Sequence, residues 1–293
     1  MNRIQTWLVA ARPFSFPATV IPVAGGSLAA AAATPAGFAW MPFLVALAAM
    51  LLLHSGVNMR SDAADFLVGI DRDAHPASGA VVRGLLTPAQ ARRGGMFVLA
   101  CGALLGLSLV PRVGPELLAL GAAGGACGLA YPRLKRHTLG DAAVLTAFGL
   151  LGSLGGWAVQ TGGFAWAPLL WGLPPGLLVA AILHANNWRD AAADRAAGIR
   201  TVAGRLGPRG ALYYYAALMT LPYALVPLLV ALPAPEGRLP ATTLLTAASL
   251  PAAILLVRRA RRGALRALDA STAQLNLLFG ALYLLGFVLD IAV

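Results

Sequence analysis

Two short segments of this chain combine side chains that bind metal ions and phosphates. The first, NMRSDAADFLVGIDRD, follows a long apolar stretch and contains Asn58, Asp62, Asp65, Asp71 and Asp73. On a helix that continues past Asn58, the side chains of Asn58, Asp62 and Asp65 share one face, because they are four and three residues apart. Carboxylates grouped in this way repel one another unless a cation neutralises them. The segment therefore predicts a cation site, and Gly69 allows a turn that returns Asp71 to it.

The second segment, HANNWRDAAADRAAGIRT, has the same character. It places Asn186, Asp190 and Asp194 at spacings of four residues, again on one helical face. One alternative is that these acids only balance neighbouring arginines at a membrane edge. Their distribution favours a site instead, because six of the chain's 11 acidic residues fall in the two segments.

The donor types predict a hard metal ion. The chain has only two cysteines and four histidines, so carboxylate oxygens dominate any metal site. Mg²⁺ normally takes one or two carboxylates and keeps its other positions for water and substrate phosphates. Two Mg²⁺ ions, or Mn²⁺ in their place, would bridge the segments and clamp a diphosphate. The predicted metal ligands are Asp62, Asp65, Asp71, Asp190 and Asp194.

Basic side chains close to the two segments would complete such a clamp, because Lys and Arg bind phosphate oxygens. The predicted diphosphate contacts are Arg60, Arg83, Lys135, Arg136, Arg189 and Arg200. The alternative for each is a contact with anionic lipid, and this alternative is favoured for the basic block from Arg258 to Arg266.

The composition indicates which elements must position these segments. The chain is 59% apolar and only 11% charged, with a mean hydropathy of +0.75, and these values exclude an ordinary soluble protein. A helix of about 20 apolar residues crosses the hydrocarbon core. Nine stretches approach this length and predict an all-α, polytopic membrane protein with one domain over residues 1–293: 16–34, 40–57, 95–111, 114–131, 140–160, 168–187, 211–231, 241–257 and 273–292.

The positions of the basic residues predict the orientation in the membrane. Of the 22 Lys and Arg residues, 20 fall on one side of the nine predicted spans, and only Arg112 and Arg238 fall on the other. The positive-inside rule then places the amino terminus and both polar segments in the cytoplasm, and the carboxyl terminus outside the inner membrane. The net charge of +11 is therefore explained by the orientation of the protein in a lipid bilayer and does not indicate a nucleic-acid partner.

With these segments, the sequence resembles the UbiA-type superfamily of intramembrane prenyltransferases, whose members carry two Asp-rich motifs after spans two and six of a nine-helix bundle. Within it, the sequence is most similar to the 1,4-dihydroxy-2-naphthoate polyprenyltransferases of menaquinone biosynthesis. The likeness lies in ARPFSFPATVIPVAGG, the run from Asn58 to Asp71, NNWRDAAADRAAGIRTVAGRLG and TAQLNLLFG. HPASGAVVRG replaces the Arg-Thr and Arg-Pro pairs typical of 4-hydroxybenzoate enzymes and haem farnesyltransferases, which favours the naphthoate branch. YPRLKRHTLGD departs from that branch and is more similar to the hydroxybenzoate enzymes.

The resemblance implies transfer of a polyprenyl group from a prenyl diphosphate to an aromatic acceptor. For the naphthoate it also implies loss of the carboxylate as carbon dioxide. Mg²⁺ on the aspartates would neutralise the departing diphosphate, and a dry cavity would let the allylic cation meet the ring before water does. The catalytic set would be Asn58, Asp62, Asp65, Asp190 and Asp194, and the further substrate contacts Asn186, Asn187 and Tyr131.

Alternatives concern both the acceptor and the class of protein. An aromatic acceptor of the 4-hydroxybenzoate or homogentisate type would use the same residues. An ion-coupled transporter would place its key acids near mid-membrane, but no acid lies in the interior of a predicted span, and Asp141 and Asp290 lie at span ends.

Three other residue types in the predicted spans have expected roles. The glycines of stretches 114–131 and 140–160 are expected to pack helices together, with lining of the cavity as the alternative. The tryptophans are expected to anchor the protein at the membrane interface, with stacking on a cation or acceptor as the alternative. His54 and His184 are candidates for supporting the polar segments.

Overall fold

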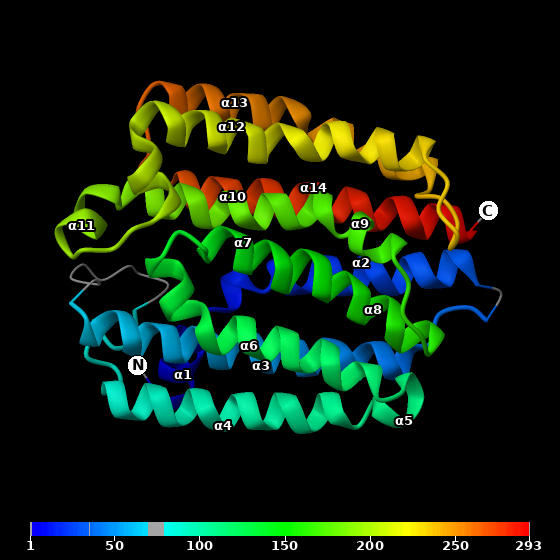
Figure 1. Cartoon of the computed structure of the whole chain (residues 1–293), viewed down its shortest axis with the longest axis horizontal. Helices are drawn as coiled ribbons and strands as arrows, with labels where there is room; N and C mark the ends of the chain where they lie inside the picture. Colours follow the sequence, from blue (N-terminus) through cyan, green and yellow to red (C-terminus); the bar gives the residue numbers. More distant parts are fainter. Residues whose placement is uncertain (1, 35, 70–78, 293) are drawn as a thin grey trace.

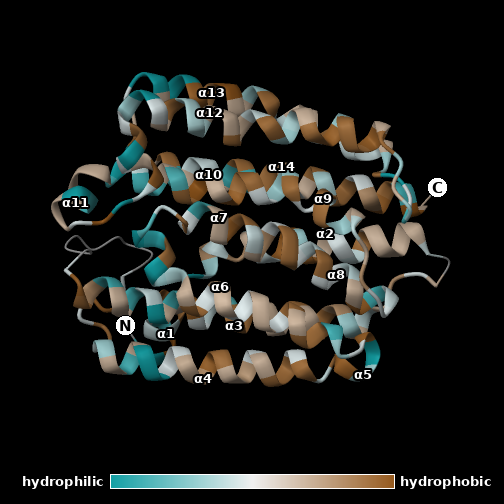
Figure 2. Cartoon of the chain, in the orientation of Figure 1, coloured by the Kyte–Doolittle hydropathy of each residue, from teal (hydrophilic) through white to brown (hydrophobic). Residues whose placement is uncertain are grey.

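The described part of the chain is a bundle of helices that run side by side along one axis (Figure 1). The computed structural model describes residues 2–34, 36–69 and 79–292, and no strand occurs in these ranges. Hydrophobic residues lie along the middle of the helices and hydrophilic residues gather at the two ends of the bundle (Figure 2). Helices suit a membrane because they satisfy their backbone hydrogen bonds internally.

In chain order the elements are α1 (Arg3–Ala11), η1 (Pro13–Ser15), α2 (Pro17–Ala33), α3 (Trp40–Leu67), α4 (Pro88–Leu107), α5 (Val110–Val113), α6 (Glu116–Arg136), α7 (Gly140–Val144), the π-helix η2 (Leu145–Leu151), α8 (Gly152–Thr161), α9 (Ala167–Trp171), α10 (Leu173–Arg189), α11 (Ala191–Ala196), α12 (Val202–Ala231), η3 (Ala241–Ser249), α13 (Leu250–Arg261) and α14 (Leu268–Ala292).

Six of the described helical stretches are long and apolar enough to cross a membrane, and the pair α1–η1 and α2, bent by 55°, makes a seventh. The six are α3, α4–α5, α7–α8, α12, η3–α13 and α14. The predicted count of nine is therefore not confirmed. The two other predicted spans correspond to α6 and α10. The first is rich in glycine and ends in basic residues, which lowers its hydropathy, and the second has only 17 residues.

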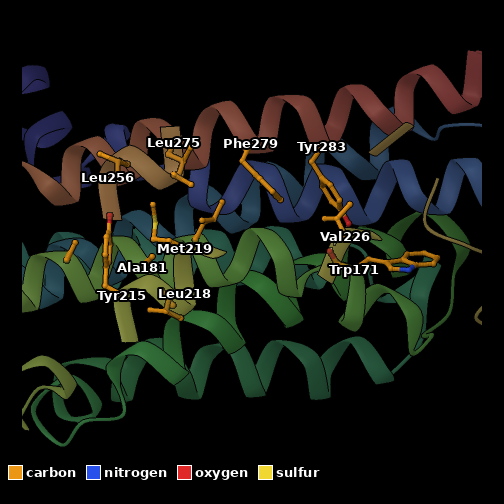
Figure 3. Packing of buried hydrophobic residues seen from close by; sticks show 14 of the residues in the cluster. Trp171, Ala181, Tyr215, Leu218, Met219, Val226, Leu256, Leu275, Phe279 and Tyr283 are labelled. Atoms are coloured by element: carbon orange, nitrogen blue, oxygen red, sulfur yellow. Dashed lines mark hydrogen bonds between the residues drawn. The ribbon is translucent and has the colours of Figure 1, made fainter. Parts of the chain in front are cut away.

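The largest buried cluster holds α10, α12, α13 and α14 together. Phe279, Tyr215 and Tyr283 are buried in it, and Figure 3 shows their rings among Leu, Met and Val side chains. The tyrosine hydroxyls have partners: Tyr215 pairs with Thr272 at 2.7 Å, and Tyr283 donates to the carbonyl of Trp171 at 2.9 Å. Because lipid is as apolar as this cluster, close packing and such hydrogen bonds stabilise the contacts between helices.

Glycines allow the closest contacts around η2 and α8. A Cβ at Gly176 would lie 2.7 Å from the Cα of Gly149, so only glycine fits at this crossing of α10 and η2. A Cβ at Gly156 would overlap the carbonyl of Val23 on α2. The predicted packing role of glycine is therefore met in this part of the bundle.

Candidate active site

A cavity of about 1680 Å³ lies inside the bundle, and residues from both polar segments line it. Its apolar wall includes Met50, Leu53, Leu99 and Leu120, from α3, α4 and α6. Its polar residues cluster where α3 and α10 end, at the end of the bundle that carries α11 in Figure 1. We call this part the polar mouth, and define it by the lining residues Arg12, Asn58, Asp65, Lys135, Asn186, Asn187, Arg189, Asp190, Asp194, Arg266 and Asp269.

The first polar segment remains helical to the end of α3, as its spacing predicts. Asn58 borders the cavity, and its Nδ2 donates to the carbonyl of Ala11 at 3.0 Å. Asp62 is buried outside the lining. Its Oδ1 accepts from Nη2 of Arg12 at 3.2 Å, and its Oδ2 accepts from the backbone N–H of Val81 at 3.0 Å. Both oxygens of this predicted metal ligand are thus engaged by the protein.

Asp65 borders the cavity although it is only 4% exposed. Its Oδ2 lies 3.4 Å from Nζ of Lys135 on α6 and 3.5 Å from Oγ of Ser61. Its Oδ1 is buried and has no hydrogen-bond partner among the described residues. A buried carboxylate oxygen without a partner costs free energy, so this oxygen is available to a ligand of the cavity.

Arg12 is a residue of the mouth that was not among the predicted site residues. Its charge served only to predict the orientation of the protein in the membrane. It ends α1 in a left-handed conformation with φ of 57°, where the chain bends by 55° before α2. A non-glycine residue in this region is strained by about 1–3 kcal/mol, and such strain often occurs at functional sites. The bend brings the guanidinium back to Asp62 and to the cavity wall.

The second polar segment interrupts its helix. α10 ends at Arg189, and Asp190 separates it from the short α11. The Arg189 guanidinium donates to both oxygens of Asp190 at 2.8 and 2.7 Å, to Asn186 at 2.8 Å and to Asp269 of α14 at 2.6 Å. Arg189 lies beyond the predicted span 168–187, and its hydrogen bond to Asp190 raises the pKa of the guanidinium. This network ties the end of α10 to α14, and Asp269 is a mouth residue that the sequence analysis missed.

Two other residues of this segment also line the mouth but are almost fully buried. Asp194 on α11 is 5% exposed, and Asn187 on α10 is 3% exposed. Oδ1 of Asn187 has no hydrogen-bond partner among the described residues. Tyr131 lines the cavity from α6, as Asn186 does from α10. The predicted substrate contacts Asn186, Asn187 and Tyr131 therefore come together around one cavity.

Four predicted diphosphate contacts lie away from the described cavity wall. The side chain of Arg60 lies against Gly95 of α4. Nη2 of Arg136 donates to the carbonyl of Ala64 at 3.3 Å. Arg200 is exposed, and its backbone N–H donates to the carbonyl of Arg136 at 3.2 Å. The cavity wall thus includes Lys135 and Arg189 but not the set Arg60, Arg83, Arg136 and Arg200.

The described residues fit a metal only as part of a mixed oxygen site. Within residues 2–34, 36–69 and 79–292, no group of three or more His, Cys, Asp or Glu side chains is arranged to hold an ion. Asp71 and Asp73 lie outside the described residues. The unpartnered oxygen of Asp65 and the partly exposed carboxylate of Asp190 are hard donors facing one cavity. This donor set suits Mg²⁺, which takes few carboxylates and completes its octahedron with water and phosphate oxygens.

The apolar wall corrects two expectations. Gly121 and Gly125 of α6 line the cavity, and a Cβ at either position would meet nothing within 4 Å among the described residues. They therefore widen the cavity instead of packing helices. Trp157, Trp171 and Trp188 are buried and lie outside the cavity lining, so they face neither an acceptor nor the membrane interface, whereas Trp166 is exposed.

The two histidines of the predicted spans also differ from each other. His54 lines the cavity, where its ring nitrogens pair with Thr19 at 2.8 Å and Ser15 at 3.2 Å. His184 lies outside the lining, and its Nδ1 is 3.5 Å from the buried Asp141. Only His54 is therefore placed to support the mouth.

Comparison with known protein families identifies the family of this chain. A model of the UbiA prenyltransferase family matches residues 19–279. The chain belongs to the UbiA prenyltransferase family. UbiA prenyltransferase domain-containing protein 1 of Xenopus tropicalis is 35% identical over 299 residues, which cover 98% of this chain and 83% of that protein. The protein of the same name from Homo sapiens is 35% identical over 295 residues, which cover 98% of this chain and 85% of that protein.

Solved structures of UbiA homologs share the fold. One from Aeropyrum pernix K1 has a TM-score of 0.70 at 22% identity and covers 99% of both chains. One from Archaeoglobus fulgidus, bound to DMAPP and Mg²⁺, has a TM-score of 0.65 at 14% identity and covers 95% of this chain and 99% of that chain. The chain is thus a multi-pass, all-helical prenyltransferase of the UbiA type.

Proposed function

We propose that this UbiA prenyltransferase transfers a polyprenyl group from a prenyl diphosphate to an aromatic acceptor, 1,4-dihydroxy-2-naphthoate, and forms the demethylmenaquinone skeleton. The observation that carries the proposal is the cavity, which joins a mouth of carboxylates, amides and cations to an apolar interior. A prenyl diphosphate has the same division between a charged head and an apolar tail. The diphosphate would lie in the mouth and the isoprenoid chain along α3, α4 and α6.

Six charged residues of the mouth have a role in this proposal. Asp65 and Asp190, with Asp194, would hold Mg²⁺ or Mn²⁺ in the mouth. Lys135 and Arg189 would donate to phosphate oxygens, since both already lie beside carboxylates of the mouth. The metal would supply positive charge where the leaving diphosphate becomes negative. Arg12 keeps Asp62 neutralised and holds the amino-terminal segment against the mouth.

The reacting carbon needs protection from water. The allylic carbon would lie just below the mouth, where the cavity wall becomes apolar. The electron-rich ring of the acceptor is the nucleophile, so no side chain has to form a covalent bond, and the enzyme contributes by positioning. With the naphthoate as acceptor, the new carbon–carbon bond replaces the bond to the carboxylate, which leaves as carbon dioxide.

The choice of the naphthoate rests on sequence. It is supported by the run from Asn58 to Asp71, by HPASGAVVRG in place of the Arg-Thr and Arg-Pro pairs, and by NNWRDAAADRAAGIRT. The segment YPRLKRHTLGD is the opposing feature. A pocket for two fused rings would hold a single ring loosely and out of register with the allylic carbon, which costs rate as well as affinity.

The test is a competition assay with purified protein, one polyprenyl diphosphate and equal amounts of 1,4-dihydroxy-2-naphthoate, 4-hydroxybenzoate and homogentisate. We expect the naphthoate to be prenylated at least about tenfold faster, equivalent to about 1.4 kcal/mol in the transition state. Preference for either benzene-ring acid would contradict the proposed acceptor. Turnover of none of the three would contradict an aromatic acceptor altogether.

We also propose the orientation that the charge distribution predicts. The six long apolar stretches, the bent pair, α6 and α10 would make nine spans in the inner membrane. The amino terminus and the mouth would face the cytoplasm and the carboxyl terminus the outside. A cysteine introduced at the exposed Ala192 of α11, with Cys101 and Cys127 replaced by alanine, should react with an impermeant thiol reagent only from the cytoplasmic side. Labelling from the outside would contradict this topology.

A further inference from the structure

Asn276 on α14 is a polar residue of the cavity that the catalytic proposal does not use. It is 1% exposed and lines the cavity, and its Oδ1 has no hydrogen-bond partner among the described residues. An amide oxygen that is buried without a hydrogen-bond partner destabilises the fold. Such a group inside a cavity indicates a partner that occupies the cavity.

The face of α14 shows how deep this group lies. Asp269, Ala273 and Asn276 follow one another at spacings of four and three residues, and all three line the cavity. Asp269 is bound by Arg189 in the polar mouth. A helix rises 1.5 Å per residue, so Asn276 lies about 10 Å farther into the bundle. It is therefore below the site proposed for the diphosphate and not beside it.

Contacts between α14 and α2 identify the neighbours of Asn276. A Cβ at Gly280 would overlap the side chain of Ile21, and one at Gly25 would lie 3.7 Å from Cε1 of Tyr283. The two helices therefore run in the same direction, with Gly280 level with Ile21 and Tyr283 level with Gly25. Asn276 is four residues, about one turn, before Gly280, and Pro17 is four residues before Ile21. Because the helices are parallel, Asn276 is expected to lie beside Pro17 and Ala18, and both of these residues line the cavity.

Ala18, the expected neighbour of Asn276, packs near two aromatic rings. It packs in a small cluster with Val144 and Val179, and against this cluster lie the rings of Phe148 and Tyr131, which both line the cavity. Phe148 belongs to the π-helix η2, and its ring centroid is 4.7 Å from that of His54. A π-helical turn shifts the direction of its side chains and is frequent at functional sites. An amide from α14 and an aromatic ring from η2 thus both line the cavity in the region of Ala18.

We infer that Asn276 and Phe148 form the subsite for the aromatic acceptor, in which a ring hydroxyl hydrogen-bonds to the Asn276 amide and the ring packs against Phe148. This inference rests on the proposed function. The amide presents an oxygen or an NH₂ group after a turn of its terminal torsion, so it serves a hydroxyl as acceptor or as donor. The depth is suitable, because the acceptor ring must approach the allylic carbon from below the diphosphate. Ala273, at the same face of α14, leaves room for the ring.

The test compares Asn276→Leu and Phe148→Leu with the neighbouring control Leu277→Ala, which alters a side chain 53% exposed outside the cavity. KM is measured separately for the prenyl diphosphate and for whichever of the three aromatic acids the parent prenylates. We expect both subsite variants to raise the KM of the acceptor at least about tenfold and to change the KM of the prenyl diphosphate less than about twofold. Phe148→Tyr should restore the KM of the acceptor.

The outcomes separate the subsite from the proposed function. An unchanged KM for the acceptor in Asn276→Leu overturns the subsite and leaves the prenyltransfer proposal standing. A parent that prenylates none of the three acids overturns the proposed function itself. If Asn276→Leu does not fold, Asn276→Ser replaces it, because serine keeps a hydrogen-bonding group but is too short to reach the same ligand. The same rise in KM is expected for that variant, and its absence overturns the subsite.

Discussion

The two polar segments contain the same residue types and meet at one cavity, but the protein treats their charges differently. In the first, Asp62 and Asp65 lie on an unbroken helix, are at most 4% exposed and pair with Arg12 and Lys135 from other helices. In the second, the helix breaks at Asp190, whose side chain is 41% exposed and pairs with its own neighbour. The first segment is therefore fixed before a ligand arrives, whereas the second has room to adjust.

This difference separates structural from chemical roles for similar aspartates. A buried carboxylate with two protein partners contributes to folding, and removal of its charge leaves the partner cation unpaired. A partly exposed carboxylate beside its neighbour contributes little to folding. It can exchange that neighbour for a metal ion without loss of a buried contact.

The largest expected effects come from Asp62→Asn and Asp190→Asn. Both should lower turnover about 100-fold or more, because Asp190→Asn removes a carboxylate from the mouth and Asp62→Asn removes the partner that holds Arg12 in the mouth. Only Asp62→Asn should also lower the free energy of unfolding, by about 2 kcal/mol, since it leaves Arg12 without its carboxylate. Turnover and thermal unfolding of the purified variants check this, with the exposed Asp290→Asn as control. Equal free energies of unfolding for the two variants would contradict the difference proposed between the two segments.

Lys135→Met should have the next largest effect. It removes the cation 3.4 Å from Asp65 and one predicted donor to the diphosphate, so turnover should fall at least about tenfold. Arg133→Met is the matched control, because Arg133 lies in the same helix but is exposed outside the cavity lining. Steady-state rates that fall equally in the two variants would show that charge at this end of α6, and not the position of Lys135, matters.

Gly125→Leu should separate the interior of the cavity from its mouth. A leucine there would project into open space along the path of the tail, so the rate with a long prenyl diphosphate should fall about tenfold relative to the rate with a short one. Ala126→Leu, on the exposed side of the same helix, should leave this ratio unchanged. A ratio that stays constant in Gly125→Leu would place the tail elsewhere.

The smallest effects are expected for Arg60→Gln and Arg200→Gln. Neither side chain lines the described cavity, so turnover should change less than about threefold. Initial rates at saturating prenyl diphosphate provide the measurement. A loss comparable to that of Lys135→Met would mean that one of these arginines moves into the mouth when substrate binds.

The sequence predicted what depends on local spacing. The shared helical face of Asn58, Asp62 and Asp65 follows from periodicity, and α3 is helical over all three, although only Asn58 and Asp65 line the cavity. The two segments meet at one cavity, and Lys135 lies in its wall. The role of Lys135 as a diphosphate contact stays a prediction. Arg12 and Asp269 were not predicted, because their partners Asp62 and Arg189 are 50 and 80 residues away. The glycines of α6 and of η2–α8 have similar spacing in the sequence. Only the neighbouring helices decide that Gly149 packs and Gly125 faces the cavity.

The span count shows the same limit. Apolar length alone favours nine crossings, but because of the break before α10 and the glycines of α6, only six or seven of the described helical stretches are long and apolar enough to cross a membrane. Asn276 illustrates the opposite case. It lies in TAQLNLLFG, a segment of the family resemblance, but a single asparagine in an apolar stretch carries no periodic signal, and its position on the cavity wall indicates the role proposed for it.

The most direct test of the central claim, that both segments hold one prenyl diphosphate through Mg²⁺, is calorimetric binding of geranyl diphosphate to the purified protein with Mg²⁺ and with excess EDTA. We predict that EDTA weakens binding about 100-fold or more, equivalent to about 2.7 kcal/mol. Asp65→Asn and Asp190→Asn, one from each segment, should each weaken binding in Mg²⁺ and leave the weak binding in EDTA unchanged. Tight binding in EDTA, or binding in Mg²⁺ that neither variant alters, would contradict the account.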